Sequence, residues 1–304
     1  MIFDTHGKSN SKERLYALQI VPPKILTMNT DGSDCHALIN NTGGHPDGIT
    51  ADLMRGHLYW TNMGKKFNQE DGFIERSDLD GCNRVIIVPR GATFTPKQIE
   101  YDPVTDRLYW CDREGMRVMS CDRDGKDIRT LVQTGEGAED RKNKELHCVG
   151  IAVDPQNGYF YWTQKGPSKG NAGRILRAGL NPPDNYDPSH RSDITVLLDN
   201  LPEPIDLLLS PDKSKLYWTD RGQPPKGNTL NVADIVNGQL INHRILINSL
   251  KEGIGVCPNQ DWTKLYVSDL VLGHIRRYDV EKSETGIIHR GWPITGMVCV
   301  PASE

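Results

Sequence analysis

Short runs of apolar and β-branched residues recur along the whole chain, and turn residues separate them at close intervals. This pattern is typical of strands that bury one face. In the clearest stretch, four such runs predict strands at residues 98–102, 107–112, 116–122 and 128–133. The Asp124-Gly125 pair between the last two tolerates positive φ and favours a hairpin turn. No long helical periodicity competes, so we expect repeated four-stranded antiparallel units.

The second strand of this unit carries a phrase that recurs through the chain. Here it reads Arg107-Leu108-Tyr109-Trp110-Cys111-Asp112, and related phrases occupy residues 57–62, 159–164, 215–220, 264–269 and, in degraded form, 14–19. The tyrosines of successive copies are 43, 50, 52, 56 and 49 residues apart, the length of a four-stranded blade. The same strand pattern returns in the units 47–88, 149–198, 204–247 and 254–288. The expected fold class is all-β, a six-bladed β-propeller with four-stranded blades.

The two ends of the chain complement each other. The first unit begins at its second strand, near Leu15-Tyr16, without the apolar strand that precedes the tyrosine elsewhere. Residues 293–300 have the pattern of this missing strand. We expect the C-terminal strand to complete the N-terminal blade, which removes exposed sheet edges. The expected organisation is an N-terminal tail, 1–13, and a single propeller domain, 14–304.

The recurring tetrads, such as Tyr59-Trp60-Thr61-Asn62 and Tyr217-Trp218-Thr219-Asp220, identify a family. Over residues 14–300 the chain resembles the YWTD six-bladed propellers of the low-density lipoprotein receptor group. A tyrosine and a tryptophan in each blade most simply pack between neighbouring sheets. The acidic residue of the tetrad most simply ties blades together by hydrogen bonds. The motif therefore describes the scaffold and leaves the function to the loops.

Composition and charge narrow the classes of partner. The chain has 36 basic and 40 acidic residues and a net charge of −4, so we expect neither nucleic-acid nor membrane binding. Its seven cysteines fall singly in different blades and form no CxxC pair, which predicts neither a disulfide framework nor a zinc site. No run of eighteen apolar residues occurs, and residues 1–8 do not resemble a secretory signal. We expect a cytoplasmic protein.

Loop positions predict where a ligand binds. Loops that enter each first strand should share one face with the loops that join second to third strands. The long loops at 63–71, 134–146, 165–173 and 221–228 are typical of lids or binding surfaces. Residues that open the innermost strands should meet at the mouth of the central channel. The candidate catalytic residues there are His45, His147, Asp47 and Asp206, and the candidate substrate-binding residues are Phe94, Thr95, Lys97, Glu203, Glu252, Trp292 and Thr295.

This set of side chains has a chemical interpretation and a structural one. Histidines, carboxylates, a lysine and aromatic rings around one funnel can orient a small polar-aromatic molecule and move protons near neutral pH. In the structural interpretation, the same groups only cap the channel through hydrogen bonds to water. Both interpretations depend only on the position of these residues in the repeat, because no sequence motif supports either.

Metal and cofactor chemistry is weakly indicated. Around Ser210-Pro211-Asp212 the chain resembles the gluconolactonase propellers, which hold calcium through Glu, Asn and Asp oxygens. The resemblance places their metal-binding asparagine at Ile205, which cannot coordinate a cation, and leaves Asp47 as the one matching ligand. We therefore disfavour a metal-dependent lactonase and expect no metal. A nucleophile elbow, a P-loop and a Rossmann glycine pattern are absent, so we expect no cofactor.

As a stand-alone propeller of this length, the chain also resembles the fungal hetero-Diels-Alderases of tropolone sesquiterpenoid biosynthesis. Those pericyclases join a tropolone quinone methide to a humulene-type alkene in secondary metabolism. The resemblance implies a meroterpenoid pathway and small-molecule substrates. It implies that His45, His147 or a carboxylate assists the loss of water from a hydroxymethyl tropolone. It also implies that Phe94 and Trp292 hold the two reactants within bonding distance.

A non-catalytic propeller that binds a peptide or protein is the alternative from another class. In that case a positive rim would face an acidic segment and Trp292 would be an energetic anchor. The basic residues of this expected rim are Lys65, Lys66, Lys165, Lys169, Arg221 and Lys226. The sequence leaves the oligomeric state open.

Overall fold

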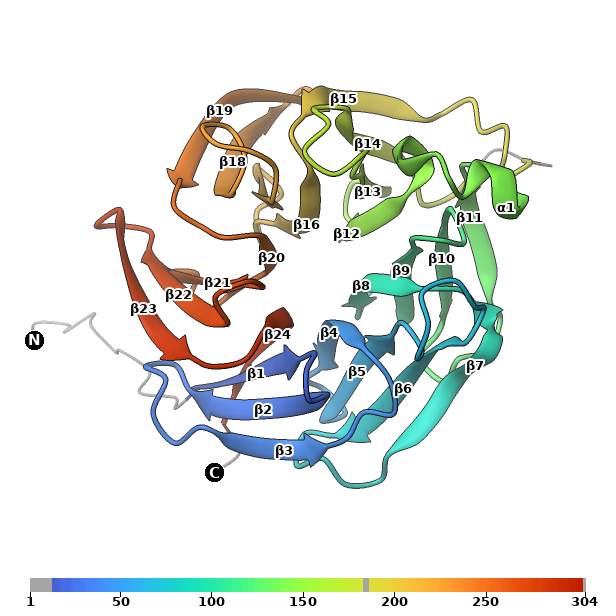
Figure 1. Cartoon of the computed structure of the whole chain (residues 1–304). Helices are drawn as coiled ribbons and strands as arrows, with labels where there is room; N and C mark the ends of the chain where they lie inside the picture. Colours follow the sequence, from blue (N-terminus) through green and yellow to red (C-terminus); the bar gives the residue numbers. More distant parts are fainter. Residues whose placement is uncertain (1–12, 183–185, 303–304) are drawn as a thin grey trace, which may run out of the picture.

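The computed structural model describes residues 13–182 and 186–302, which form six four-stranded antiparallel sheets arranged radially about a common centre (Figure 1). Blade 1 comprises β24 (Ile294–Pro301), β1 (Glu13–Gln19), β2 (Lys24–Asn29) and β3 (His36–Asn40). Blade 2 comprises β4 (Pro46–Asp52), β5 (His57–Asn62), β6 (Gly72–Asp78) and β7 (Val85–Thr93). Blade 3 comprises β8 (Pro96–Asp102), β9 (Arg107–Asp112), β10 (Arg117–Asp122) and β11 (Arg129–Gln133).

The second half of the chain repeats this arrangement. Blade 4 comprises β12 (Cys148–Asp154), β13 (Tyr159–Gln164), β14 (Gly173–Gly179) and β15 (Thr195–Leu201). Blade 5 comprises β16 (Pro204–Leu209), β17 (Lys215–Asp220), β18 (Thr229–Val236) and β19 (Gln239–Ile247). Blade 6 comprises β20 (Gly253–Pro258), β21 (Lys264–Asp269), β22 (His274–Asp279) and β23 (Glu284–Arg290). A short helix, α1 (Gly137–Asp140), and a 3-10 turn (Lys144–Leu146) lie between blades 3 and 4. The predicted fold class is confirmed.

The C-terminal strand closes the ring as expected. β24 pairs antiparallel with β1, so that Leu15 lies opposite Cys299 and Tyr16 opposite Val298. Blade 1 therefore combines the two ends of the described chain, and β24 pairs with the inner edge of β1 that would otherwise be exposed. Of the expected N-terminal tail, residues 1–12 lie outside the described residues, and Glu13 begins β1.

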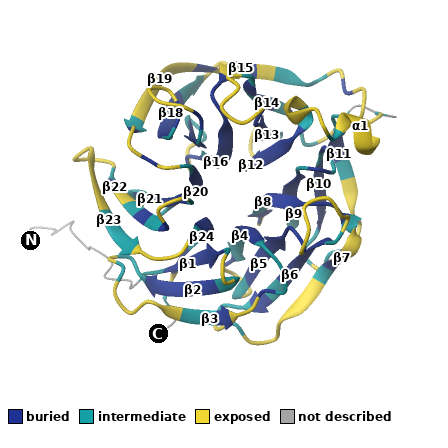
Figure 2. Ribbon diagram, viewed as in Figure 1, coloured by how far each residue is buried: buried dark blue, intermediate teal, exposed yellow. Residues whose placement is uncertain are grey.

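The aromatic residues of the tetrads form the packing between blades. The side chains of Trp60, Trp110, Trp162 and Trp218 are almost completely buried, and Figure 2 shows the inner strands as the most buried part of each blade. Tyr59 stacks on Tyr101 of the next blade, with ring centroids 5.9 Å apart. The large buried area of these rings makes them the main apolar contribution to the scaffold.

The hydroxyl residue of the tetrad, and not its acidic residue, joins one blade to the next. The Thr61 hydroxyl donates to the Lys97 carbonyl of blade 3 at 2.7 Å and accepts from Gly48 N at 2.8 Å. Thr163, Thr219 and Ser268 make the same inter-blade bond, with oxygen–oxygen distances of 2.8, 2.6 and 2.5 Å. The sequence-based expectation that the acidic residue ties the blades is therefore corrected.

The acidic residue instead holds the linker that enters its own blade. Asp112 accepts from the backbone N–H groups of Phe94 and Thr95, both at 2.8 Å. Blade 1 lacks the hydroxyl because its tetrad has Leu18 at that position. There Thr295 of β24 donates to the Pro46 carbonyl of blade 2 at 3.0 Å, so a neighbouring strand supplies the missing bond.

Two buried carboxyl groups add further bonds between blades. Asp206 Oδ2 accepts from Val256 N of blade 6, and Glu100 Oε2 accepts from Val153 N of blade 4, each at 2.9 Å. Burial raises the pKa of both groups to about 8. Both side chains are therefore mainly protonated at neutral pH.

Glycine allows the inner strands to approach closely. A Cβ at Gly150 would lie 2.1 Å from the Ile205 carbonyl oxygen, and the equivalent positions Gly48, Gly255 and Gly296 have 2.5–2.7 Å to the next blade's backbone. These contacts involve backbone atoms that cannot move without separating the blades.

We expect Gly150→Ala to destabilise the propeller by about 1–3 kcal/mol, because the added methyl group must push blades 4 and 5 apart. Gly286→Ala on β23 is the matched control, since nothing lies within 4 Å of its Cβ position. Chemical denaturation of both variants measures the effect. Equal midpoints for the two variants would contradict the close-approach argument.

Asp206 predicts a pH dependence of stability. Its pKa is higher in the folded chain, about 8, than its ordinary value of 3.8, so its contribution to stability falls as pH rises from about 4 to about 8. In Asp206→Asn, which has no proton to lose, the slope of the free energy of unfolding should flatten by up to about 1.4 kcal/mol per pH unit. Urea denaturation between about pH 5 and 7 measures it. Identical slopes would mean that folded Asp206 is ionised.

Candidate functional site on the loop face

Backbone bonds bring the strand-entry linkers and the loops after the tetrads onto one face. In each blade the residue before the first strand bonds to the residue after the tetrad. The donor–acceptor pairs are Met63 N to His45 O, Arg113 N to Thr95 O, Lys165 N to His147 O, Arg221 N to Glu203 O, Leu270 N to Glu252 O and Ile20 N to Pro293 O. Five of the predicted site residues thus occupy equivalent positions in different blades.

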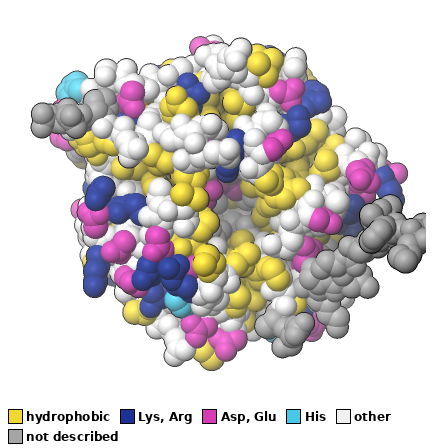
Figure 3. Space-filling model, turned by 180° about the vertical axis from the view of Figure 1, so that it is seen from behind, with side chains coloured by type: hydrophobic (Ala, Val, Ile, Leu, Met, Phe, Trp, Pro, Cys, Tyr) yellow, Lys and Arg dark blue, Asp and Glu magenta, His cyan; other side chains and the backbone are white. Residues whose placement is uncertain are grey.

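The residues after the tetrads divide the centre of this face into two halves. Arg113, Lys165 and Arg221 follow the tetrads of blades 3, 4 and 5, which are neighbours in the ring. Met63, Leu270 and Ile20 occupy the same position in blades 2, 6 and 1. One side of the hub is therefore basic and the other apolar. On the opposite side of the disc, apolar side chains surround the central opening and most charged groups lie farther out (Figure 3).

The basic half encloses a small hub cavity. Its volume is about 10 Å³, and it is lined by Lys97, Arg113, Val149, Lys165, Ile205, Arg221 and Ile254. A cavity of this size has room for one water-sized group. The wide funnel expected from the sequence is therefore not present at the hub, because long basic side chains fill it.

Carboxylates hold these basic groups. Lys97 Nζ lies 2.5 Å from Asp47 Oδ1, and burial lowers the pKa of Lys97 to about 8. Glu203 is 1% exposed and lies 3.2 Å from Lys165 and 2.8 Å from Arg221. Asp47 and Glu203 are thus fully engaged in ion pairs. Asp47, a predicted catalytic residue, is thus the ion-pair partner of Lys97.

His147, another predicted catalytic residue, is buried. Its side chain is 1% exposed, and its Nε2 lies 3.0 Å from the Arg141 carbonyl, to which it donates. Burial lowers the pKa of the imidazole to about 4, so it is neutral at physiological pH. A ring with this environment orders the 134–147 linker and has no access to a substrate.

Four more predicted residues face inward because the linkers fold over them. Phe94 is 7% exposed and lies beneath the Arg141 guanidinium, 4.2 Å from its ring centroid. The Thr95 hydroxyl bonds to the Glu114 carboxylate. Asp206 and Thr295 are occupied by the inter-blade bonds described above. Their roles in this structure are to hold the scaffold.

Glu252 and Trp292, also predicted from the sequence, are accessible but do not line the hub cavity. Glu252 is one-third exposed, with its carboxylate 3.9 Å from Arg221. Trp292 is 60% exposed in the linker between β23 and β24. They line neither the hub cavity nor the groove at His45.

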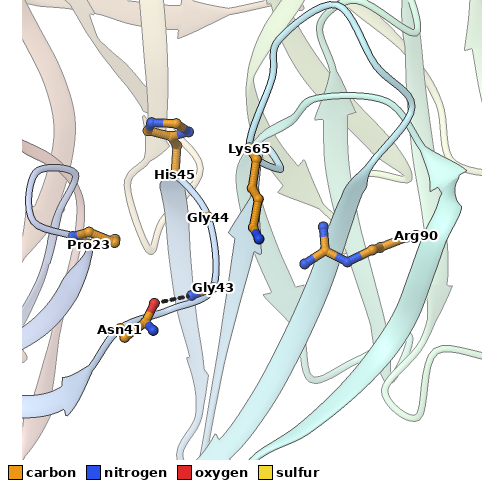
Figure 4. Close-up of a pocket in the computed structure, with 7 residues that line it drawn as sticks. All are labelled: Pro23, Asn41, Gly43, Gly44, His45, Lys65 and Arg90. Carbon is orange, nitrogen blue, oxygen red and sulfur yellow. Dashed lines mark hydrogen bonds between the residues drawn. The ribbon is translucent and has the colours of Figure 1, made fainter.

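His45 lies in a larger groove between blades 1 and 2. The groove has a volume of about 490 Å³ and is lined by Pro23, Asn41, Gly43, Gly44, His45, Lys65 and Arg90. In Figure 4 the Lys65 ammonium and the Arg90 guanidinium lie near each other on one side of the drawn residues, and Pro23 and Asn41 lie on the other. Positive φ at Asn41 and Gly43, with a 3.0 Å bond from Gly43 N to Asn41 Oδ1, shapes the linker that forms one wall.

The Arg90 side chain and the His45 imidazole of the groove are held in place by contacts with their own blade. The Arg90 guanidinium stacks over Phe73 at 4.0 Å and donates to the Asp71 carbonyl at 2.6 Å. His45 Nδ1 lies 3.0 Å from the Gly64 carbonyl. Since a carbonyl oxygen can only accept, Nδ1 carries the hydrogen of this bond, and Nε2 is the nitrogen that can exchange a proton with a ligand. Phe67 packs against the imidazole, with ring centroids 5.1 Å apart.

Three residues of this face were not among the site residues predicted from the sequence. Arg113 has a readable signal, because it directly follows a tetrad. Phe67 lies on a loop that length alone singled out, and it reaches both His45 and Arg113. Arg90 belongs to the outer strand β7 and reaches the groove only through its stacking on Phe73, which no sequence pattern indicates.

The structure also bears on metal and membrane sites. Within residues 13–182 and 186–302, no three His, Cys, Asp or Glu side chains gather closely enough to hold a metal ion. Ile205, where the lactonase resemblance placed a ligand, forms part of the hub wall. In the same described residues, the helices are too short and too polar to cross a bilayer.

Comparison with known proteins gives close fungal relatives. The chain is 42% identical over 276 residues to the low-density lipoprotein receptor-related protein 1 of Pyricularia oryzae, which covers 87% of this chain and 88% of that one. It is 38% identical over 236 residues to the 3-hydroxyacyl-CoA dehydrogenase-like protein LAM1 of Cochliobolus heterostrophus, covering 74% of this chain but 50% of that protein. No family model matches the chain.

Solved structures agree on the fold. A chain in the crystal structure of a nidogen–laminin complex superimposes with a TM-score of 0.70 at 20% identity, covering 95% of this chain and 98% of that one. A putative 6-phosphogluconolactonase from Bacteroides uniformis gives a TM-score of 0.57 at 14% identity, with 92% and 83% coverage. The tetrads, the closed six-bladed ring and the extent of the first match lead to one conclusion: the chain belongs to the family of six-bladed YWTD propellers that includes the fungal low-density lipoprotein receptor-related protein 1.

Proposed function

We propose that this propeller is a cofactor-independent pericyclase acting in the cytoplasm on small molecules of fungal secondary metabolism. In this proposal it catalyses a hetero-Diels-Alder cycloaddition between a tropolone-derived quinone methide and a humulene-type sesquiterpene. The observation that carries the proposal is the 490 Å³ groove that His45, Lys65 and Arg90 line together. The hub cavity, at about 10 Å³, is too small for either reactant.

The polar wall of the groove suits the tropolone. Two adjacent oxygens on a seven-membered ring form a flat acceptor edge, which an arginine fork and an ammonium group recognise. Arg90 and Lys65 both line the groove, and Figure 4 shows their cationic ends near each other on one side of it. Their charge stabilises the partial negative charge that develops on the tropolone oxygens as the ring hydroxyl loses its proton.

His45 supplies the acid–base chemistry. Its protonated imidazole donates a proton to the leaving hydroxyl of the hydroxymethyl tropolone as the C–O bond breaks, and water departs. The ring hydroxyl of the tropolone then returns a proton to the imidazole, which leaves a neutral quinone methide. In the cycloaddition one C–C and one C–O bond form with the alkene. No electrons enter or leave, so the reaction needs no redox cofactor.

Apolar side chains at the edge of the groove suit the alkene. Phe67 is 44% exposed and packs on His45, and Val21, 51% exposed, belongs to the same loop as the groove residue Pro23. Holding both reactants in one orientation supplies several kcal/mol toward the barrier of an intermolecular cycloaddition. Because the propeller walls are rigid, the orientation also selects one face of the alkene.

A protein-binding role is the second candidate. Of the six rim residues expected for it, Lys65, Lys66, Lys169 and Lys226 are exposed, whereas Lys165 and Arg221 are committed to Glu203. The name of the Pyricularia relative, a receptor-related protein, is consistent with binding. A metal-dependent lactonase has less support, because Asp47 is paired with Lys97.

The central test is His45→Ala, assayed with a hydroxymethyl tropolone and humulenol-type alkene. We expect the rate of stereochemically enriched adduct to fall by about 10²–10⁴, the usual contribution of a general acid. The matched control is His190→Ala, whose side chain is 82% exposed and paired with Asp187 away from the groove. Chiral chromatography of the products measures both rate and enrichment.

Other variants distinguish the two candidates. Arg90→Met should raise KM for the tropolone and leave the alkene unaffected, because it removes a tropolone contact. Lys66→Met with Lys226→Met should leave catalysis intact and weaken capture of an acidic partner. Wild-type protein that yields no enriched adduct above background would rule out the pericyclase.

A further inference from the structure

The hub cavity collects basic groups that the proposed reaction does not use. Lys97 and Arg113 come from blade 3, Lys165 from blade 4 and Arg221 from blade 5, and all four line a space of about 10 Å³. The rest of its wall is apolar, formed by Val149, Ile205 and Ile254, which are 1–4% exposed and pack as one cluster. Four cationic side chains thus converge on a space for one small group.

The paired carboxylates do not line this space. Asp47 lies 2.5 Å from Lys97, Glu114 lies 2.7 Å from Arg113, and Glu203 contacts Lys165 and Arg221. Glu252, one-third exposed, is a second and more distant partner of Arg221 at 3.9 Å. None of these four acidic residues contributes to the cavity lining. The carboxylates therefore pair with the basic groups without themselves lining the cavity, whose polar wall comes from the four basic residues alone.

The basic groups lie close enough to affect one another's pKa. After burial, Arg113 and Arg221 contribute to lowering the pKa of Lys97, and the same two arginines contribute to lowering that of Lys165. Like charges interact strongly where water is largely excluded. A negative charge placed in the cavity would be attracted by the basic residues that line it, and the carboxylates that pair with them do not line the same space.

We propose that the hub binds a single small monovalent anion, a halide or a carboxylate group, between Lys97, Arg113, Lys165 and Arg221. The cavity volume selects for size, because a water-sized group fits and a phosphate with its four oxygens does not. The basic groups come from three adjacent blades, so the anion links blades 3, 4 and 5 at the centre of the ring. This site is separate from the groove of blades 1 and 2.

Chloride is the first probe. Thermal unfolding is measured in sodium chloride and in sodium gluconate at equal ionic strength, since gluconate is too large for the cavity. We expect a saturable rise in Tm of about 2–5 °C in chloride. Lys165→Met should lose this difference, because one of the four cations is gone. Lys226→Met, an exposed lysine on the loop after the blade 5 tetrad, should keep it.

Crystals of the wild-type protein soaked in bromide give an independent measurement, which decides the matter even if Lys165→Met does not fold. An anomalous peak between the four basic groups supports the proposal. A parallel series in sodium formate identifies the natural class: a larger rise in Tm with formate than with chloride assigns the site to a carboxylate. Equal Tm in all salts together with no bromide peak at the hub would overturn the proposal. That result would leave the His45 groove and its assay unaffected.

Discussion

The ring depends on one hydrogen bond that repeats between blades. In blades 2, 4, 5 and 6 the tetrad hydroxyl donates to the carbonyl of the next inner strand, as Thr163 donates to Ile205 while it accepts from Gly150 of its own blade. In blade 3 the Cys111 thiol takes this place and donates to the Gly150 carbonyl at 3.1 Å. Such a bond forms only if the inner strands lie very close, and glycine at the contact makes that distance possible. Because each bond is buried at the hub, breaking one would leave an unsatisfied polar group between two sheets.

A ring held from its inner strands leaves its loops free to differ. The residue after each tetrad is placed at the same height in every blade by a backbone bond, whatever its side chain. In this chain those positions are basic over three adjacent blades and apolar over the other three. The basic side fills with long ion-paired side chains and closes to a small cavity. Open space remains at blades 1 and 2, where the linker is rich in glycine.

The two cavities therefore suit different ligands. Charges at the hub are desolvated and paired, so each is held in one geometry, and the space between them has the size of an ion. The groove is open to solvent and combines an imidazole, two cations and an exposed aromatic ring. A large organic substrate needs the second arrangement. The two cavities thus differ in burial: the side chains around the hub cavity are buried and leave little space, whereas the groove is open to solvent.

Because the sequence pattern repeats, it was sufficient to predict the fold. Strand patterns, turn residues and tetrad spacing are local signals, and together they predicted six blades and the closing strand β24. They also predicted which residues reach the loop face, because position within a repeat determines height along the blade. His45 lies in a cavity for this reason, and the equivalent residues of the other blades lie at the same level.

Accessibility was decided by the tertiary structure alone. Each inner strand changes register just where it enters the hub, for example between Pro46 and Ile49 and between Pro204 and Leu207, so simple alternation no longer gives the direction of a side chain. Asp206 and Thr295 accordingly bond to neighbouring blades, and the linker of α1 covers His147 and Phe94. Arg90 reaches the groove from an outer strand. The sequence determines which residues lie near the hub. Which of them are exposed to solvent depends on contacts between blades, and these contacts join segments that are far apart in the chain.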